Sequence, residues 1–343
     1  MSVAAPPLPS PRFDHLLALT DEIGTFEHAE YASPRREHGY CTDDMARVLV
    51  LVAREPAPAP PVRDLGRTAM RFLVRSQSIV GRSRNRRHVD GGWRDPYGID
   101  DCWGRSVAAF GVAARCGHDD WTRQMGMASF GHAIQQRSPH LHAMAFAAVG
   151  AAEVLRADRH HYGARALLAD CVDAVGPPIE DPSWPWPLPR LSYANATVAE
   201  ALVASGDALG RPDVVQHGCD LLDWLLDRET IDGHLSPTPV GGSGPGDTGP
   251  RFDQQPIEVA AMADACARAQ AVTGDARWGR GIDLAVDWFL GGNDAGAVMF
   301  DPDTGGAYDG LHATGPNRNE GAESTIALIS TLQHGRHRTA ATP

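Results

Sequence analysis

The stretch HGYCTDDMARVLVLVAR, His38–Arg54, introduces the pattern from which the fold can be predicted. Thr42 stands where a helix N-cap is expected, and an apolar run with helical spacing follows it. Two carboxylates, Asp43 and Asp44, occupy the first turn, one turn before Arg47. An acid in the first turn stabilises a helix by about 0.3–1 kcal/mol, which accounts for one carboxylate more readily than for two. The second carboxylate therefore indicates a site, provided that the pattern recurs.

Helical spacing does recur, and the helices alternate in character. Every second helix is small and apolar throughout, as in SVAAFGVAAR and AMAFAAVGAA, whereas its predecessor carries a polar face. A helix that is apolar on nearly all sides is buried. The sequence therefore predicts an all-α fold, an (α/α)6 toroid of six helical hairpins in which outer helices surround six inner ones. The predicted helices span 12–22, 42–54, 62–78, 101–116, 119–134, 140–157, 162–175, 192–207, 211–228, 254–272, 276–290 and 321–334.

The loops differ in length according to the direction in which they connect the two rings. Connections from an inner to the next outer helix are short, whereas the reverse connections tend to be long and rich in Gly, Pro and aromatic residues. Loops longer than about 12–15 residues in a compact domain are usually functional or disordered. We expect the long loops to gather where inner helices begin. The predicted organisation is a disordered arm over 1–11, one toroid domain over 12–334 and a frayed tail over 335–343.

Composition narrows the function classes. The 343 residues carry a net charge of −12, which argues against non-specific nucleic-acid binding. The basic run Gly81–His88, GRSRNRRH, is the exception, and we interpret it as a solvated loop. Six cysteines without a CxxC pair favour reduced thiols and a cytoplasmic location. We see no signal peptide and no apolar run of the roughly 20 residues that span a bilayer.

Carboxylates recur at the starts of the predicted inner helices. GIDDCWGR repeats the arrangement of GYCTDDMAR, and QQPIE and NEGAEST add further acids. In a toroid these helix starts converge on one end, where two carboxylates in different environments can act as general acid and general base. The candidate catalytic residues are Asp44, Asp101, Glu258 and Glu323.

The apolar neighbours of Glu258 predict a raised carboxyl pKa and hence the role of general acid. Asp44 or Asp101 would then be the base that activates water. For a carbohydrate substrate, Trp93 or Trp103 would stack on a sugar ring. No metal site is predicted, because HExxH and zinc-type Cys/His spacing are missing, and no cofactor is predicted, because nucleotide-binding motifs are missing. The candidate substrate-binding residues are Tyr40, Asp43, Arg47, Trp93, Asp100, Trp103, Arg105, His142, Tyr193, Asn195, Gln254, Gln255, His312 and Glu320.

These features predict a carbohydrate-active enzyme, in the first place an inverting glycoside hydrolase that acts on an oligosaccharide or glycan end. Phosphorolysis is the related expectation, because Arg47, Arg94 and Arg105 could hold phosphate. A sugar epimerase is an alternative, with His140 and His142 as a weak acid–base pair. The alternative outside catalysis is a glycan-binding or scaffolding module that serves a partner glycosyltransferase.

Several motifs together resemble one bacterial family of helical domains. They are REHGYCTDDMAR, IDDCWGR, FDQQPIE, WFLGGNDAG, DPDTGGAYDGLH and NEGAEST, and they cover nearly the whole chain. Members of that family stand alone or follow glycosyltransferase domains, from which they often take a glycosyltransferase label. This chain lacks a nucleotide-sugar-binding half, so the label does not describe its chemistry. More broadly, the pattern is similar to (α/α)6 carbohydrate-active enzymes such as glucoamylase-like hydrolases and sugar 2-epimerases.

Overall fold

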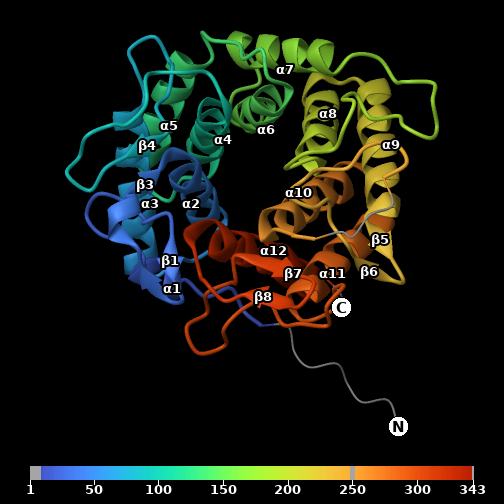
Figure 1. Cartoon of the computed structure of the whole chain (residues 1–343). Helices are drawn as coiled ribbons and strands as arrows, with labels where there is room; N and C mark the ends of the chain where they lie inside the picture. The colour runs from blue at the N-terminus through green and yellow to red at the C-terminus, as the bar shows by residue number, and fades with distance from the viewer. Residues whose placement is uncertain (1–8, 248–251, 342–343) are drawn as a thin grey trace.

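Twelve α-helices alternate between an outer and an inner ring within residues 9–247 and 252–341, which a computed structural model describes (Figure 1). The helices are Asp14–Ala18 (α1), Thr42–Arg54 (α2), Pro60–Ser76 (α3), Asp101–Cys116 (α4), Asp120–Ala133 (α5), Leu141–Ala157 (α6), Tyr162–Val175 (α7), Ala196–Leu209 (α8), Pro212–Arg228 (α9), Pro256–Thr273 (α10), Arg277–Phe289 (α11) and Ala322–Ala341 (α12).

The inner helices form a closed ring. In order they are α2, α4, α6, α8, α10 and α12, each packs against the next, and α12 returns to α2. The outer helices α3, α5, α7, α9 and α11 each cover the inner helix that precedes them in the sequence, and α1 packs against α12. This arrangement confirms the predicted (α/α)6 toroid.

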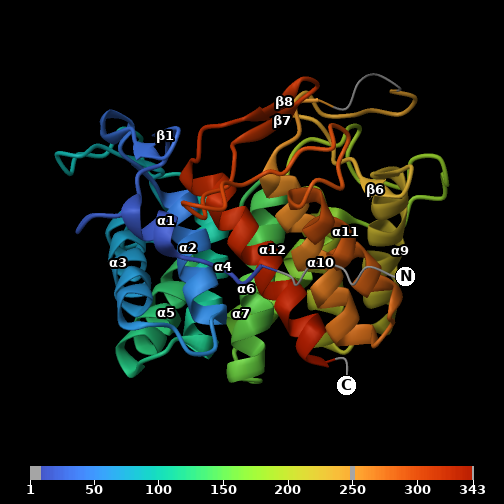
Figure 2. The same cartoon turned by 90° about the horizontal axis from the view of Figure 1, so that it is seen from below.

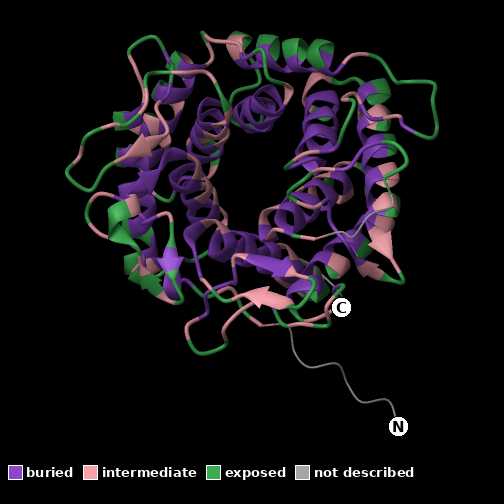
Figure 3. Cartoon of the chain, viewed as in Figure 1, coloured by how far each residue is buried: buried purple, intermediate pink, exposed green. Residues whose placement is uncertain are grey.

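Small residues allow the inner helices to pack closely. All residues of α6 from His142 to Leu155 are buried, whereas the outer helices are buried along one face (Figure 3). A Cβ atom added at Gly104 of α4 would lie 2.2 Å from the Ala143 carbonyl oxygen, and one added at Gly111 would lie 2.1 Å from that of Gly150. The backbones of α4 and α6 are therefore in direct contact, which explains the small apolar composition of the inner helices.

Short hairpins and long loops gather at the end of the toroid where inner helices begin (Figure 2). The strands form two-stranded antiparallel sheets, in which β1 pairs with β2, β3 with β4, β5 with β6 and β7 with β8. A 3-10 turn, Arg36–His38, precedes β3. The strands are Ala29–Glu30 (β1), Ser33–Pro34 (β2), Tyr40–Cys41 (β3), Arg86–Arg87 (β4), Thr230–Ile231 (β5), His234–Leu235 (β6), Gly310–His312 (β7) and Gly315–Asn317 (β8).

Some boundaries differ from the prediction. The helix expected over 12–22 ends at Ala18, because Asp21 closes a turn by accepting the Ile23 N–H at 2.8 Å. The helix expected from 192 begins at Ala196, because Ala194 has a φ of 46°. Helix α12 continues to Ala341, seven residues past the predicted helix end at 334; the frayed tail expected over 335–343 stays a prediction. Residues 1–8 of the expected arm and 342–343 of the expected tail lie outside the described residues.

The described helices include none that is long and apolar enough to cross a membrane. All six cysteines are free thiols, and all but Cys116 are buried.

Candidate active site

Three adjoining pockets lie at the end of the toroid where the inner helices begin. Tyr193 lines all three, so they meet around its side chain. The central pocket, of about 390 Å³, is lined by Glu27, His28, Cys41, Asp43, Asp44, Arg47, Arg86, Asp101, Arg105, Tyr193, Gln255, Asp309, Gly321, Glu323 and Ser324. The acidic side pocket, of about 440 Å³, is lined by Asp43, Ser83, Asn85, Asp95, Pro96, Gly98, Asp100, Asp101, Cys102, His140 and Tyr193. The loop pocket, of about 350 Å³, is lined by Arg190, Leu191, Ser192, Tyr193, Thr238, Pro239, Val240, Gly241, Gly242, Gln255 and Glu258.

Arg47 joins two carboxylates on neighbouring helices in the central pocket. Its Nη1 lies 2.7 Å from Asp44 Oδ1 and 2.8 Å from Glu323 Oε2. Burial raises the pKa of Asp44 to about 7, although the Arg47 guanidinium opposes this shift. Burial also acts to raise the pKa of Glu323, but Arg47 and Arg105 outweigh it and lower that pKa. Glu323 is therefore ionised at neutral pH, whereas Asp44 is close to its titration point.

Asp43 belongs to a second charged group in the same wall. Its Oδ1 lies 3.4 Å from Arg105 Nε, and its Oδ2 accepts a hydrogen bond of 2.8 Å from the Asn85 amide. The Arg105 guanidinium is stacked 3.9 Å from the centre of the Phe146 ring. Asp43 and Arg105 thus connect α2 to α4, and Phe146 extends the contact to α6.

Neither of the two acids in the first turn of α2 caps that helix. The N-cap residue is Cys41, and no side chain provides a cap hydrogen bond. The predicted cap, Thr42, lies inside the helix and donates its hydroxyl to the Arg84 carbonyl at 2.6 Å. The prediction of Thr42 as N-cap was wrong. Asp43 and Asp44 instead form ion pairs in the wall of the central pocket.

Glu258 in the first turn of α10 is a buried carboxyl group on the wall of the loop pocket. Its Oε1 accepts the Ala194 N–H at 2.6 Å. Burial raises the pKa of Glu258 to about 8, against the opposing effect of main-chain hydrogen bonds from Ala194 and Asn195. The raised pKa expected from its apolar neighbours is therefore present, and the carboxyl group is largely protonated at neutral pH.

Residues 193 and 194 link Glu258 to a carboxylate on the opposite side of the inner ring. The Tyr193 hydroxyl donates a hydrogen bond to Asp101, while the next main-chain N–H binds Glu258. The Tyr193 ring stacks on His142, with 4.6 Å between ring centres. Ala194 adopts a φ of 46°, which non-glycine residues rarely adopt outside functional or strained sites. This unusual turn places consecutive residues in contact with the two carboxylates.

Three aromatic residues predicted at the site instead pack away from the pockets. Trp103 is fully buried and donates its indole N–H to the Ala133 carbonyl at 3.1 Å. Tyr40 is buried and donates its hydroxyl to Asp21 at 2.7 Å. Trp93 packs against Phe72, with 5.5 Å between ring centres.

Two arginine side chains approach the ring of Trp93. The guanidinium groups of Arg84 and Arg87 lie 5.8 and 5.6 Å from its ring centre. We therefore remove Trp93, Trp103 and Tyr40 from the candidate set, because their rings are engaged in packing.

Four polar residues predicted at the site stabilise the surrounding loops and line none of the three pockets. Gln254 is fully buried and accepts the Trp288 indole N–H at 3.0 Å. Asn195 accepts the Ser192 N–H at 2.9 Å and so holds the turn before α8.

Glu320, a candidate substrate-binding residue, precedes α12 and accepts the Thr304 hydroxyl at 2.7 Å. His312 is exposed and pairs with Asp253, with 2.5 Å between His312 Nδ1 and Asp253 Oδ1. The side chains of Gln254, Asn195, Glu320 and His312 are therefore corrected to positions outside the three pockets, although the main-chain N–H of Asn195 bonds to Glu258.

The remaining predicted residues line at least one pocket or contact Tyr193. Asp100 lines the acidic side pocket, Gln255 lines the central and loop pockets, and His142 supports the Tyr193 ring.

Asp309 is a carboxyl group in the central pocket that the sequence interpretation missed. Burial raises its pKa to about 6, while it accepts the Gly321 N–H at 2.8 Å and the Ser324 hydroxyl at 3.0 Å. It lies just before β7, far from any predicted helix start, so the helix pattern gave no signal for it. The hairpin of β7 and β8 and its hydrogen bonds to Gly321 and Ser324 bring it to the pocket.

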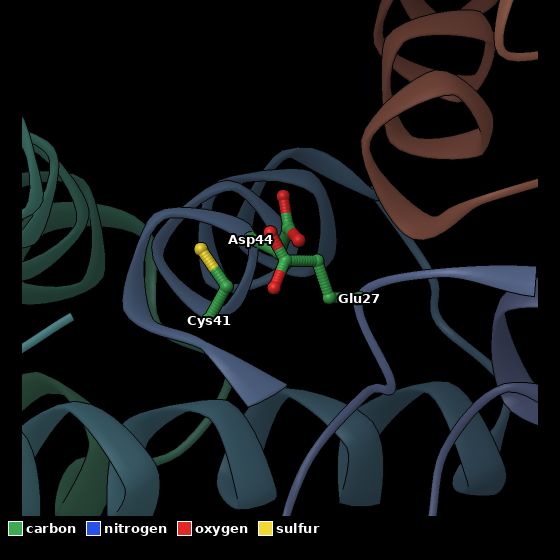
Figure 4. A group of neighbouring side chains, drawn as sticks. All are labelled: Glu27, Cys41 and Asp44. Atoms are coloured by element: carbon green, nitrogen blue, oxygen red, sulfur yellow. The ribbon is translucent and has the colours of Figure 1, made fainter. Parts of the chain in front are cut away.

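Glu27, Cys41 and Asp44 form a compact cluster in the wall of the central pocket (Figure 4). One potential metal-ligand atom from each lies within 4.8 Å of the others. Arg86 already pairs with Glu27, and Arg47 pairs with Asp44. Burial raises the pKa of the Cys41 thiol well above its ordinary value. The cluster therefore has the character of an ion-pair network around a protonated thiol rather than of a metal centre.

The fold is shared with solved structures of carbohydrate-acting enzymes. A sugar epimerase from a ruminal bacterium superposes with a TM-score of 0.70 at 12% identity, covering 94% of this chain and 95% of that one. Cellobiose 2-epimerase from Spirochaeta thermophila gives 0.68 at 13% identity, covering 95% and 93%. The cellulase Cel9M of C. cellulolyticum, solved with cellobiose, gives 0.62 at 8% identity, covering 92% and 88%.

No protein-family model and no curated protein sequence matches the chain. At identities this low, the likeness to solved structures establishes the fold alone. The chain thus has a toroidal fold that carbohydrate-acting enzymes use.

Proposed function

We propose that the protein is an inverting glycoside hydrolase that acts on an oligosaccharide or glycan end, with Glu258 as general acid and Asp101 as general base. The main observation behind this proposal is the pair of carboxyl groups linked through residues 193 and 194. Glu258 accepts the Ala194 N–H, and Asp101 accepts the Tyr193 hydroxyl. Both groups line pockets that meet at Tyr193.

The two groups suit opposite halves of a proton-transfer reaction. Protonated Glu258 would donate its proton to the oxygen of the leaving group, and Asp101 would accept a proton from the attacking water. Inverting enzymes separate these carboxyl groups by roughly 6.5–9.5 Å so that water fits between them. Asp101 and Glu258 contact opposite ends of a Tyr193–Ala194 unit and belong to α4 and α10, which agrees with a wide separation.

Phosphorolysis has weaker support than hydrolysis. Arg47 is already paired with Asp44 and Glu323, and Arg105 lies beside Asp43. A phosphate ion in the central pocket would have to displace these carboxylates from their guanidinium partners. Water needs no such rearrangement, so hydrolysis is the reaction that this charge arrangement favours.

Epimerisation is a second candidate because of His142. Its Nε2 is buried and has no hydrogen-bond partner among the described residues, and burial lowers the pKa of the ring, which favours the neutral base. An epimerase must remove a proton and return it on the other face, so it needs a second group besides His142. His140 lies 3.4 Å from Asp100 on the exposed rim and is a poor second group.

The test is incubation with a panel of oligosaccharides, with and without phosphate, followed by proton NMR of the anomeric region. An inverting hydrolase releases sugar whose first-formed anomer is opposite to the linkage cleaved. Retention of configuration would contradict the proposed mechanism, and a sugar phosphate would indicate phosphorolysis. An unshortened product altered at C2 would identify an epimerase. Glycan binding without turnover would favour the non-catalytic module, with a glycosyltransferase as the partner to seek.

A further inference from the structure

A row of cross-strand partners lies on the side of the toroid where α3, β3 and β4 meet (Figure 1). Phe26 pairs with Tyr40, Tyr40 pairs with Arg87, and Arg87 pairs with Trp93, all in antiparallel register. Phe72 of α3 contacts the rings of both Tyr40 and Trp93, with 6.2 and 5.5 Å between ring centres. Neighbouring strands lie about 4.7–4.9 Å apart, so the row from Phe26 to Trp93 spans about 14 Å.

Three arginine side chains lie against the rings of this row. At one end, Cζ of Arg36 lies 4.8 Å from the centre of the Phe26 ring. In the middle, Cζ of Arg87 lies 5.7 and 5.6 Å from the centres of two rings of the row. At the other end, Cζ of Arg84 lies 3.9 Å from the centre of the Tyr97 ring. Cation–π contacts of this kind hold guanidinium groups in place, and we call the three residues the arginine row.

The positive charge of the arginine row is not neutralised within the described part of the chain. None of its three guanidinium groups has a carboxylate oxygen within 4.0 Å among residues 9–247 and 252–341. Carboxylates nearby in the sequence are engaged elsewhere: Glu37 pairs with Arg35 at 3.1 Å, and both oxygens of Asp95 accept main-chain N–H groups. The row is therefore a local positive surface on a chain whose net charge is −12.

Further arginines crowd the row and extend its charge to the central pocket. Burial and the neighbouring Arg75 lower the pKa of Arg87, and burial and Arg94 lower the pKa of Arg86. The Arg94 N–H binds the Arg86 carbonyl at 2.9 Å, and Arg86 lines the central pocket. Like charges so close to one another repel, and an anionic ligand would relieve this repulsion.

The shape and place of the row favour one kind of anion. Arg84 and Arg87 are half-buried, so a flat bilayer would meet the exposed Arg36 but not all three groups. A nucleic-acid duplex would bring many phosphates against an otherwise acidic protein. A single polymer chain can follow a row of about 14 Å, and the guanidinium fork binds a carboxylate through two parallel hydrogen bonds.

We propose that the arginine row is a secondary binding site, outside the three pockets, for a glycan that carries carboxylate groups. That the polymer is a glycan rests on the proposed function, whereas its negative charge rests on the row itself. The glycan would lie along the row with its end directed past Arg94 and Arg86 into the central pocket. The substrate class is then an acidic, uronate-containing polysaccharide.

The experiment is calorimetric titration of the full chain with a de-esterified oligogalacturonide and with a neutral maltooligosaccharide of equal length. The oligogalacturonide is expected to bind at least about tenfold more tightly, with an affinity that falls as salt is added. Equal binding of the two glycans, or no binding of the oligogalacturonide, would overturn the proposal. Binding to vesicles of phosphatidylcholine and phosphatidylglycerol without binding of the oligogalacturonide would show a membrane surface instead.

Variants locate the binding on the molecule. Arg84→Gln and Arg36→Gln change opposite ends of the row and should each weaken binding of the oligogalacturonide several-fold. Arg165→Gln removes the same charge from an exposed position on the outer helix α7 and should bind like the wild type. An equal loss in Arg84→Gln and Arg165→Gln would show that only the total charge matters, and it would contradict a site at the arginine row.

This proposal and the proposed hydrolase can fail separately. Tight binding of the oligogalacturonide that Arg84→Gln weakens, without hydrolysis of any glycan, would keep the arginine row and remove the hydrolase. Hydrolysis of neutral glycans without any preference for the oligogalacturonide would keep the hydrolase and remove the secondary site.

Discussion

The carboxyl group of Glu258 shows how one residue acquires its chemistry from its surroundings. It is buried at the start of α10, and its pKa rises to about 8. A carboxyl group in the first turn of a helix is normally stabilised in its ionised form by the helix dipole. Burial here outweighs that effect, and the carboxyl group stays largely protonated at neutral pH.

Glu258→Gln is expected to lower kcat by about 10²–10⁴-fold on a confirmed substrate, because the amide keeps size and shape but cannot donate the proton. In the wild type, activity should fall as pH rises through about 8, where Glu258 ionises. Glu55→Gln is the matched control, since Glu55 follows α2 at the opposite end of the toroid and pairs with Arg336. If Glu258→Gln turns over like Glu55→Gln, Glu258 is not the acid.

The same residue makes stability depend on pH. The pKa of Glu258 is about 8 when folded against an ordinary value of 4.5, so the folded state holds a proton that the unfolded state releases. Its contribution to stability is complete below about 4.5 and is lost as pH rises to about 8. The side chain of Glu258→Gln cannot ionise. The free energy of unfolding of this variant, minus that of the wild type, should therefore increase from pH 5 to pH 9. Urea denaturation at both pH values measures this difference, and a constant difference would contradict the assigned shift.

At the scale of elements, the contact between α4 and α6 determines which residues the inner ring tolerates. Gly104 and Gly111 on α4 face main-chain carbonyls of α6, and Gly150 on α6 faces Val107 in return. The close approach leaves no room for a β-carbon, so glycine is required here for space rather than for an unusual backbone angle.

Gly111→Ala is expected to destabilise the protein by about 1–3 kcal/mol, because the new methyl group would overlap the Gly150 carbonyl and force the helices apart. Gly131→Ala on the outer helix α5 is the control, because in the described part of the chain no atom beyond its own helix backbone and chain neighbours lies within 4 Å of the added Cβ. That change should be neutral or stabilise by up to about 1 kcal/mol through helix propensity. Chemical denaturation of both variants measures the two effects. Equal stabilities would show that the inner helices separate without cost.

At the scale of the whole molecule, the sequence predicted the ring but not the packing within it. Alternation of polar-faced and apolar helices is a local property, so the inner and outer helices could be identified, and α2 matches its expected range. The orientation of Trp103 toward Ala133 and of Gln254 toward Trp288 depends on neighbours distant in sequence. Such side chains look the same in a sequence whether they bind a sugar or hold a loop.

The candidate site was predictable to the extent that helix starts converge in a toroid. Asp101 and Glu258 could be named because each lies in the first turn of an inner helix. The link between them through Tyr193 and Ala194 could not be predicted, since it requires a φ of 46° at an alanine. Asp309 was missed because it reaches the pocket from a hairpin.

The contact of α12 with α2 has a consequence for how the protein is made. A chain leaving the ribosome presents α2 long before α12 exists, so the side of α2 that meets α12 stays uncovered until α12 has been made. Arg47 can form its ion pair with Glu323 only after that residue, 276 positions later, has been added to the chain. Until then this part of the pocket wall is incomplete. A nascent chain therefore leaves apolar surface of α2 uncovered until α12 has been made, and the proposed site cannot be complete before residue 323 has been added.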